Sequence, residues 1–247
     1  MQDKSVEKLF KEQVEHYSQE DRVKESYALP LVLEWIKKKK FKRKAEICEF
    51  GGGAGQLLNE IRKSYPNVNL INVEIIPDYK RYMVSKKIKY VVSSVLDSKF
   101  PDNSLDVILV RDVLHHLVGR DLKETTENQR HALNELNRLI RPGGAIFIEE
   151  LTDSSEVVCT LLYYLTRINS RIGLRFLSFY VNPNVIVYFY TPKRLLQLYL
   201  EVFGEKNILI RKIDRYNTDL ISRLLHFGKE LNKVTVVLKK LELKPVK

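Results

Sequence analysis

Two hydrophobic rhythms alternate along the chain between residues 45 and 151. Short, nearly continuous apolar runs are typical of strands that are covered on both faces. Between them, apolar residues recur every three or four positions, which is typical of amphipathic helices. The predicted strands cover residues 46–50, 69–74, 88–93, 105–110 and 145–150, and the predicted helices between them cover residues 57–64, 78–86 and 122–140. This alternation predicts an α/β fold, a parallel sheet wound by right-handed crossovers.

The rhythm changes after residue 150. Residues 157–200 contain no acidic residue, and residues 151–190 hold eight aromatic residues. Alternation then resumes: Thr191 and Pro192 suit the N-cap and first position of a helix reaching about residue 203, and strands are predicted near residues 208–213 and 234–238. At the other end, two helices are predicted over residues 5–17 and 23–38, the second kinked or started at Pro30.

Composition limits the class of protein. The chain has 247 residues, 44% hydrophobic and 30% charged, which is typical of a soluble globular protein. We find no apolar run long enough to span a membrane and no secretory signal, so a cytoplasmic location is expected. Two cysteines exclude a disulfide framework and a four-cysteine zinc site, and no set of residues suggests a metal.

The net charge of +11 raises the question of nucleic acid. Much of the excess lies in residues 37–44, KKKKFKRK, with seven basic residues and no acid. Such a run can bind nucleic acid, but it is more often a solvated helix end whose lysines complement the helix dipole. Because it leads directly into the first strand, it is expected at the edge of the sheet opposite the strands' carboxyl ends. The solvated or partner-facing interpretation is therefore favoured.

Glycine is scarce, yet four of the ten glycines lie between residues 51 and 55. The order strand, glycine cluster, helix is typical of a loop whose backbone lies against a ligand. The G-x-G-x-x-G spacing of dinucleotide folds fails, since Gln56 and Leu58 stand where a third glycine is needed. Glu74 ends the second strand, where a carboxylate can accept both hydrogen bonds of a ribose diol.

With these features in order, the sequence resembles the class I S-adenosylmethionine-dependent methyltransferases. The resemblance runs over about residues 45–151, with a fainter tail to 240, and it implies a Rossmann-like, doubly wound, seven-stranded mixed sheet. Its motifs are EICEFGGGAG from Glu46, Glu74, FPDNSLDVILVRDVLHHL from Phe100 and LNRLIRPGGAIFIEE from Leu136. The implied cofactor is S-adenosyl-L-methionine, and the product is S-adenosyl-L-homocysteine.

The resemblance implies roles at both ends of the cofactor. Its ribose hydroxyls would bind Glu74, its adenine would pack on Ile75, and the adenine edge would lie at Ser94 and Val95. Many family members have an acid in place of Ser94, so either the Ser94 hydroxyl or Asp97 would accept from the adenine amino group. The methionine side would be formed by Glu49, Gly51, Gly52, Gly53, Gly55, Val110 and Arg111.

The expected reaction is a direct displacement, for which the protein aligns the acceptor and excludes water. A base is needed only for a protonated acceptor. The candidate bases are His115, His116, Glu149 and Glu150, and His116, which lies where many family members carry a histidine, is ranked first. Adjacent histidines point in different directions, so one can be packed and the other open, and a role for neither is an equal alternative.

The resemblance also suggests four segments. Residues 1–44 would be N-terminal helices forming a lid, with Tyr17 over the cofactor; residues 45–151 would be the cofactor-binding core; residues 152–190 a substrate cap; and residues 191–247 the rest of the core. The aromatic cap favours a small, apolar or aromatic acceptor. Arg167, Arg171 and Arg175 recur every four residues, as a solvated face or as a contact with an anionic substrate or lipid surface.

Two other functions stay open at this point. An RNA methyltransferase is suggested by the basic isoelectric point, although no RNA-binding module is evident. A scaffold or regulator could bind the cofactor without turnover. The expected partner is a small-molecule acceptor rather than nucleic acid; peripheral membrane contact is an option, and the chain is expected to be a monomer or homodimer.

Overall fold

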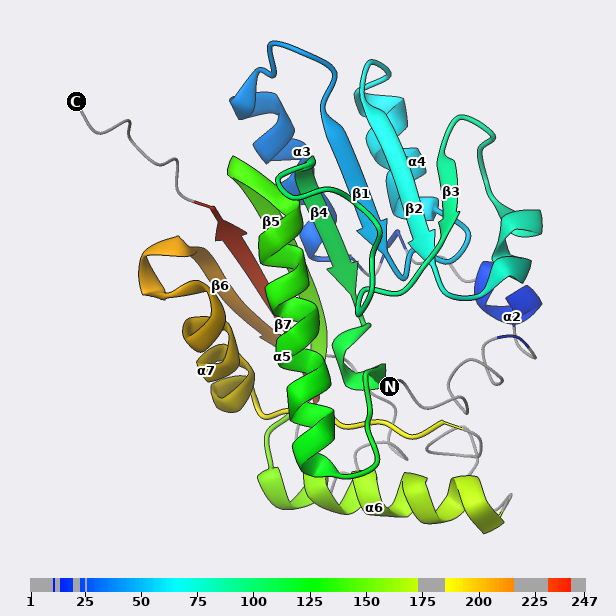
Figure 1. The fold of residues 1–247 in the computed structure, drawn as a ribbon, viewed down its shortest axis with the longest axis vertical. Helices are drawn as coiled ribbons and strands as arrows, with labels where there is room; N and C mark the ends of the chain where they lie inside the picture. The colour runs from blue at the N-terminus through cyan, green and yellow to red at the C-terminus, as the bar shows by residue number, and fades with distance from the viewer. Residues whose placement is uncertain are drawn as a thin grey trace.

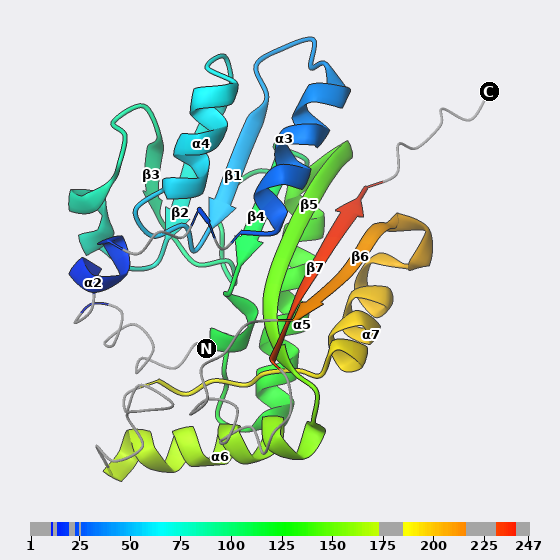
Figure 2. The same cartoon turned by 180° about the vertical axis from the view of Figure 1, so that it is seen from behind.

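The computed structural model describes residues 11, 14–19, 23–24, 26–172, 185–215 and 231–240. Within them lies a seven-stranded sheet in the order β3-β2-β1-β4-β5-β7-β6 (Figures 1 and 2). The first five strands are parallel, and β7 is antiparallel to both of its neighbours. The predicted mixed α/β sheet is confirmed. The strands are β1 (Glu46–Phe50), β2 (Asn69–Glu74), β3 (Lys89–Val92), β4 (Leu105–Arg111), β5 (Ile140–Asp153), β6 (Ile208–Arg215) and β7 (Leu231–Lys239).

Helices cover both faces of this sheet. α3 (Ala28–Lys39) and α4 (Gln56–Ser64) lie on one face, and α5 (Leu122–Leu139) and α7 (Pro192–Phe203) lie on the other (Figures 1 and 2). Successive strand residues serve opposite faces, so Ile47 packs with the α3 and α4 residues while Cys48 packs with those of α5 and α7. This two-sided burial explains why the strands read as continuous apolar runs.

The segment between β2 and β3 differs from the prediction. Residues 78–86 do not form an α-helix; a 3-10 helix, η1, covers Pro77–Tyr82, and β3 begins at Lys89. Beyond Tyr82, the backbone N–H of Val84 donates to the Ala54 carbonyl at 3.1 Å. This long-range hydrogen bond takes the place of the helical bond that would have continued the helix, and it ties the segment to the glycine loop.

β5 is longer than predicted at both ends. Ile140 already pairs with Leu105, and the register then shifts so that Ala145 pairs with Val107. The intervening residues, expected only to close the helix, therefore form an irregularity inside the strand, with Gly143 at φ +77°. The strand continues to Asp153, held by antiparallel pairing with β7.

At the N-terminal side, the described part of the predicted helix 5–17 is α2 (Val14–Gln19). The helix predicted from residue 23 begins only at Ala28, and Pro30 lies in its first turn, where proline is tolerated. Its last turn holds Lys37–Lys39, and Lys40 ends it at φ +45°. The basic run is exposed and leads to the amino end of β1, as expected.

Beyond β5, α6 (Glu156–Ile172) lies across the carboxyl end of the sheet in both views (Figures 1 and 2). Residues 185–190 return between α6 and the sheet, where Tyr190 bridges to Thr152 and the Tyr188 N–H donates to the His115 carbonyl at 3.0 Å. The predicted cap of α7 is confirmed, because the Thr191 side chain accepts from the Arg194 N–H. Arg175 lies outside the described residues.

Candidate functional site

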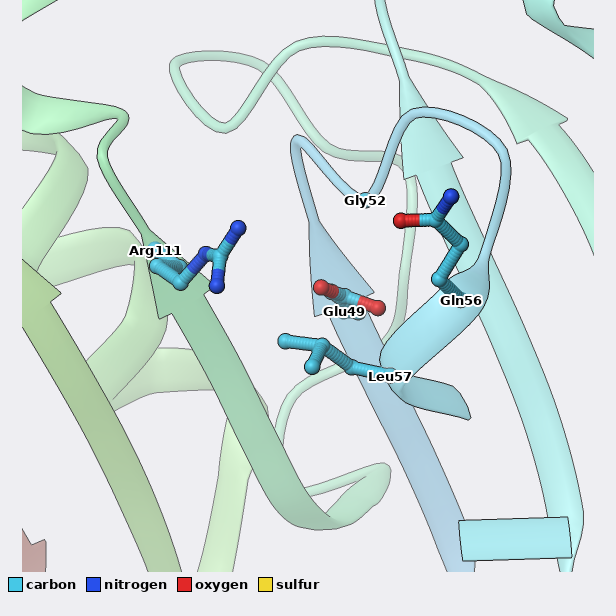
Figure 3. A pocket seen from close by; sticks show the side chains of 5 residues that line it. All are labelled: Glu49, Gly52, Gln56, Leu57 and Arg111. Atoms are coloured by element: carbon cyan, nitrogen blue, oxygen red, sulfur yellow. The ribbon is translucent and has the colours of Figure 1, made fainter. Parts of the chain in front are cut away.

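A small hollow, partly open to solvent, lies where β1 and β4 end and α4 begins. Figure 3 shows the Arg111 side chain reaching from β4 toward Glu49 and the Gly52 loop. Both charged side chains are buried, Glu49 at 4% and Arg111 at 6% exposure. The hollow therefore pairs one carboxylate with one guanidinium. Gln56 and Leu57 of α4 complete the lining.

The glycine loop beside this hollow requires glycine. Gly51, Gly53 and Gly55 have φ values of +71°, +52° and +75°, in the left-handed region that other residues rarely adopt. Gly52 is needed for space instead, because a Cβ there would lie 2.3 Å from Asn72 Oδ1 and 2.9 Å from the Glu49 carboxyl. Any larger residue at Gly52 would thus collide with the side chains of Asn72 and Glu49.

Glu74 braces this loop from the end of β2. One carboxylate oxygen accepts from the Gly53 N–H at 3.1 Å, and the other accepts from the Ile75 and Ile76 N–H groups at 2.8 and 3.3 Å. Glu74 thus joins the ends of β1 and β2, a structural role that the sequence did not indicate.

The expected adenine edge lies at the end of β3. Its backbone joins β2, with the Ser93 N–H donating to the Glu74 carbonyl at 3.1 Å. The Ser94 hydroxyl is half-buried and accepts from the Leu96 N–H, whereas Val95 is buried in the main core. Asp97 is exposed and pairs with Lys99 at 2.6 Å. Of the two acceptors left open, Ser94 is the one that is partly enclosed.

Val110 and Arg111 point to different places, as neighbours on a strand must. Val110 packs in the core against α5 residues such as Leu133, so its side chain does not line the hollow. Arg111 does line it. The same alternation separates the two acids at the end of β5, Glu149 and Glu150.

Glu149 anchors α3. It is fully buried, accepts from the Ala28 N–H at 2.8 Å and the Ser26 hydroxyl at 3.2 Å, and lies 3.6 Å from Lys233. Burial raises the pKa of its carboxyl, and the Lys233 ammonium opposes that shift. This predicted base thus serves a helix N-terminus and does not line the hollow.

Glu150 instead meets His115. One oxygen accepts from the Val113 and Leu114 N–H groups, and the other lies 2.8 Å from His115 Nδ1. When Nδ1 carries the proton, it donates to Glu150 and leaves Nε2 as the acceptor. Such a carboxylate–histidine pair fixes both the orientation and the tautomer of the ring.

The two histidines lie side by side in the 3-10 helix η2 (Leu114–His116), with ring centroids 4.1 Å apart. His115 also packs against Phe189, at 4.9 Å between ring centroids. An acid–histidine pair covered by an aromatic ring from residues 185–190 results. His116, the candidate ranked first, takes part in this cluster through its ring contact with His115.

A buried ion pair lies behind the histidines. Lys233 of β7 donates to both oxygens of Asp112, at 2.7 and 2.8 Å, and is 3% exposed. Burial alone would raise the pKa of Asp112, but Lys233 and the other cations lower it overall. Asp112 has a φ of +55°, an unusual conformation that this pairing holds in place.

Asp112, His115 and Glu150 are close enough to be considered as metal ligands, since their ligand atoms lie within 4.8 Å of one another. Their hydrogen-bonding capacity is already directed elsewhere. Lys233 engages Asp112, and Glu150 engages His115 and two backbone N–H groups. The ammonium of Lys233 would also repel a cation, so the cluster reads as an internal network rather than a metal centre.

α2 lies next to the start of α4, because Gln56 donates to the Ser18 carbonyl at 3.1 Å. The predicted lid segment thus touches a residue that lines the hollow. Tyr17 belongs to α2, but its side chain lies outside the described residues.

Residues 48–148 match the sequence model of a family described as "Methyltransferase domain". A hybrid PKS-NRPS synthetase from Talaromyces variabilis is 28% identical over 137 residues; the match covers 50% of this chain and 3% of that protein. The chain thus spans a small part of this curated relative.

Several solved structures share the fold. A possible histamine N-methyltransferase from Thermotoga maritima superposes with a TM-score of 0.57 at 15% identity, covering 95% of this chain and 99% of that one. A SAM-dependent methyltransferase from Aquifex aeolicus superposes with a TM-score of 0.55 at 14% identity, covering 92% of this chain and 98% of that one. Geranyl diphosphate C-methyltransferase from Streptomyces coelicolor superposes with a TM-score of 0.54 at 9% identity, covering 86% of this chain and 79% of that one. At these identities the likeness concerns the fold.

Fold, strand order and sequence match together define the class. Residues 48–148 match a methyltransferase domain, the fold is that of solved S-adenosylmethionine-dependent methyltransferases, and the cofactor is S-adenosylmethionine. The residues fit that molecule. A loop of glycines allows a ligand to lie close to the protein backbone, and Glu49 and Arg111 offer opposite charges to an amino-acid zwitterion. Among the helices described, none is long and apolar enough to cross a membrane.

Sequence reasoning missed the residues that connect the site. Asn72 supports the glycine loop by donating to the Gly53 carbonyl at 2.8 Å, and Lys233 lies more than a hundred positions from its partner Asp112. A polar residue inside an otherwise apolar strand was the available signal for Asn72. Glu150 is among the candidate bases of the sequence, but its pairing with His115 is not; the available signal was the two-residue alternation of β5, which separates it from Glu149.

Proposed function

We propose that this chain transfers a methyl group from S-adenosylmethionine to a small, apolar or aromatic acceptor. The observation that carries the proposal is the His115–Glu150 pair, covered by Phe189 and connected through Asp112 to the strand that holds Arg111. His115 follows Arg111, which lines the hollow, by four positions in the chain. A base and an aromatic wall beside a cofactor loop suit a flat or greasy acceptor.

For the cofactor, the proposed contacts follow the geometry of the loop. Glu49 would hold the amino group and Arg111 the carboxylate of the methionine moiety, and Gly51–Gly55 would allow the close approach. Glu74 would accept from the ribose diol while keeping its bonds to the loop. Ile75 and Ser94 would lie at the adenine; Val95 and Val110 would support these positions from the core.

Bound in this way, the cofactor supplies an electrophilic methyl group. The chain's part is to align the acceptor, exclude water and, for a hydroxyl or amine acceptor, take up a proton at His115 Nε2. Glu150 keeps the proton of Nδ1 directed toward itself, so Nε2 stays available. This geometry favours His115 over His116 and over Glu149, which caps α3.

The segments around the core belong to the same proposal. Residues 1–44 would act as a lid, supported by the Gln56–Ser18 contact, and residues 152–190 would act as the cap over the acceptor, supported by the contacts of Tyr188 and Tyr190. The cytoplasmic location and the oligomeric state remain predictions.

An assay with methyl-labelled S-adenosylmethionine tests the acceptor class. We expect label to enter organic-soluble small molecules of a cell extract, and to do so far less when His115→Gln replaces the wild-type chain. Label in bulk tRNA would instead support an RNA methyltransferase. If no fraction of the extract takes up label while calorimetry shows that S-adenosylhomocysteine still binds, the result would support a scaffold without turnover.

A further inference from the structure

The outward side of α6 is apolar where water would favour polar residues. Ten large apolar side chains among the described residues are exposed, and five of them lie on this one helix. They follow helical spacing and form a single stripe, which we call the α6 stripe: Val157, Leu161, Tyr164, Leu165 and Ile168.

The inward side of α6 is also occupied. Val158, Cys159 and Tyr163 are buried against the body of the protein. A helix that is apolar on both sides is normally covered on both sides. The α6 stripe is therefore an uncovered surface, running about 17 Å along the helix at 1.5 Å per residue.

Of the two described arginines expected on one face of α6, only Arg171 lies on the exposed side. Arg167 turns inward, donating to the Gly119 carbonyl at 2.9 Å and the Tyr163 hydroxyl at 2.6 Å. Arg171 is exposed near the end of the stripe. Beyond Glu156 at the helix start, which lies 3.9 Å from Arg194, no acid follows until residue 201. The surroundings of the stripe are thus apolar and basic.

These observations decide between partners. A second copy of the stripe would bring no acid to Arg171 along its length, since the acid at the helix start, Glu156, already lies 3.9 Å from Arg194. An anionic bilayer offers both an apolar interior for the stripe and negative charge for Arg171. The helix is too short and polar to span, so it would lie in the interface.

We propose that α6 docks this protein on an anionic lipid surface through the α6 stripe. α6 begins just after β5 ends, so docking would turn the carboxyl ends of the strands toward the bilayer (Figures 1 and 2). An apolar acceptor could then be taken directly from the lipid. That last consequence rests on the proposed function, whereas the docking itself does not.

Co-sedimentation of the full chain with vesicles tests the docking. With equal parts phosphatidylcholine and phosphatidylglycerol, the wild-type chain should pellet, and with phosphatidylcholine alone it should bind much more weakly. Leu161→Glu with Ile168→Glu should weaken binding about tenfold or more, because two exposed apolar side chains that would enter the bilayer become charged. Arg171→Gln should weaken it about fivefold.

The matched control is Leu209→Glu with Ile213→Glu, which changes two exposed apolar residues on β6. It should leave vesicle binding within about twofold of wild type. Leu161→Ala with Ile168→Ala gives a milder change, and calorimetry with S-adenosylhomocysteine verifies that each variant is folded. This readout also separates a failed docking from a failed cofactor site.

Three results would overturn the proposal. In the first, the wild-type chain stays in the supernatant with anionic vesicles. In the second, the α6 and β6 variants lose binding equally, which would indicate nonspecific attraction of a basic protein. In the third, light scattering shows a wild-type dimer that the α6 variant converts to monomer, which would make a second copy the occupant.

Discussion

Glu74 has one structural task, and a second task at the cofactor is part of the proposal. Its carboxylate accepts from the Gly53 N–H of the glycine loop and from the Ile75 and Ile76 N–H groups, and it would also accept from the ribose diol. A side chain that holds a loop and contacts a ligand is more sensitive to substitution than one that does either alone. The same holds for Glu150, which orders η2 and orients His115.

Replacing Glu74 should separate cofactor binding from folding. Glu74→Ala should weaken S-adenosylmethionine binding about 100-fold or more, since two charge-assisted hydrogen bonds and the loop geometry are lost together. Isothermal titration calorimetry measures this. Glu60→Ala, an acid on α4 away from the hollow, is the control and should bind as wild type does; equal affinity of the Glu74 variant would remove the cofactor assignment.

The two histidines should differ in their contribution to turnover. His115→Gln should lower kcat about 100-fold with a base-dependent acceptor, because general base catalysis contributes at least that much. Cofactor Kd should change less than about twofold. His116→Gln should have the smaller effect on kcat. A reversed order would restore the ranking that the sequence alone suggested.

Lys233 is the cation shared by Asp112 and Glu149. Lys233→Met should destabilise the fold by about 3–5 kcal/mol at neutral pH, because two carboxylates would be left buried without it. Urea unfolding measures the loss. Lys239→Met, on the same strand, should cost far less; a similar cost would show that the network contributes little.

The pH dependence follows from the lowered pKa of Asp112. A folded-state pKa below the unfolded value contributes stability that is present above the unfolded pKa and lost as pH falls through the folded one. The difference in the free energy of unfolding between wild type and Lys233→Met should therefore become smaller as the pH falls below about 4. The raised pKa of Glu149 also makes this difference smaller at low pH, because a protonated carboxyl no longer carries the cost of burying a charge in the variant.

At the scale of elements, helix ends place the functional residues. Glu149 receives the first N–H of α3, Thr191 caps α7, and Asp121 caps α5 by accepting from the Glu124 N–H at 2.8 Å. The α5 cap adjoins Gly119, whose carbonyl receives Arg167 of α6. The start of α5 thus helps to position α6.

Removing the α5 cap should have a measurable cost. Asp121→Ala should lower stability by about 1 kcal/mol, because an N–H of the first turn loses its acceptor. Thermal unfolding followed by circular dichroism measures it. Asp121→Asn keeps an N-cap acceptor and should remain close to wild type. Equal losses in both variants would point to the charge rather than the hydrogen bond.

For the whole molecule, the parallel arrangement brings the ends of β1, β2 and β4 to one edge. Residues from four separate motifs meet there, and the basic run of residues 37–44 is left at the other end. The +11 charge therefore says little about the reaction, and the position of the lysines argues against delivery of RNA to the hollow.

Cofactor binding should stabilise the entire domain. S-adenosylhomocysteine at one hundred times its Kd should add about 2.7 kcal/mol to the free energy of unfolding. For a chain of this size the Tm should rise by about 5 to 10 °C. NAD should give no shift, since the loop lacks the dinucleotide spacing. A shift with NAD would contradict the choice of cofactor.

The sequence by itself determined the sheet, because hydrophobic periodicity and turn chemistry are local properties. It also located the glycine loop and Glu74, since a short motif has to be continuous in the chain to shape a loop. It failed over residues 78–86, where a hydrogen bond from Val84 to Ala54 outweighed helical periodicity.

Only the tertiary structure decided which acid meets which base. Glu149 and Glu150 are neighbours in sequence, yet the pleat of β5 sends one to α3 and the other to His115. Lys233 reaches Asp112 only because β7 inserts beside β5. On α6, the turn of the helix and the inward bond of Arg167 determined which face is exposed. Contacts between distant residues depend on how the elements pack, and no local pattern records that packing.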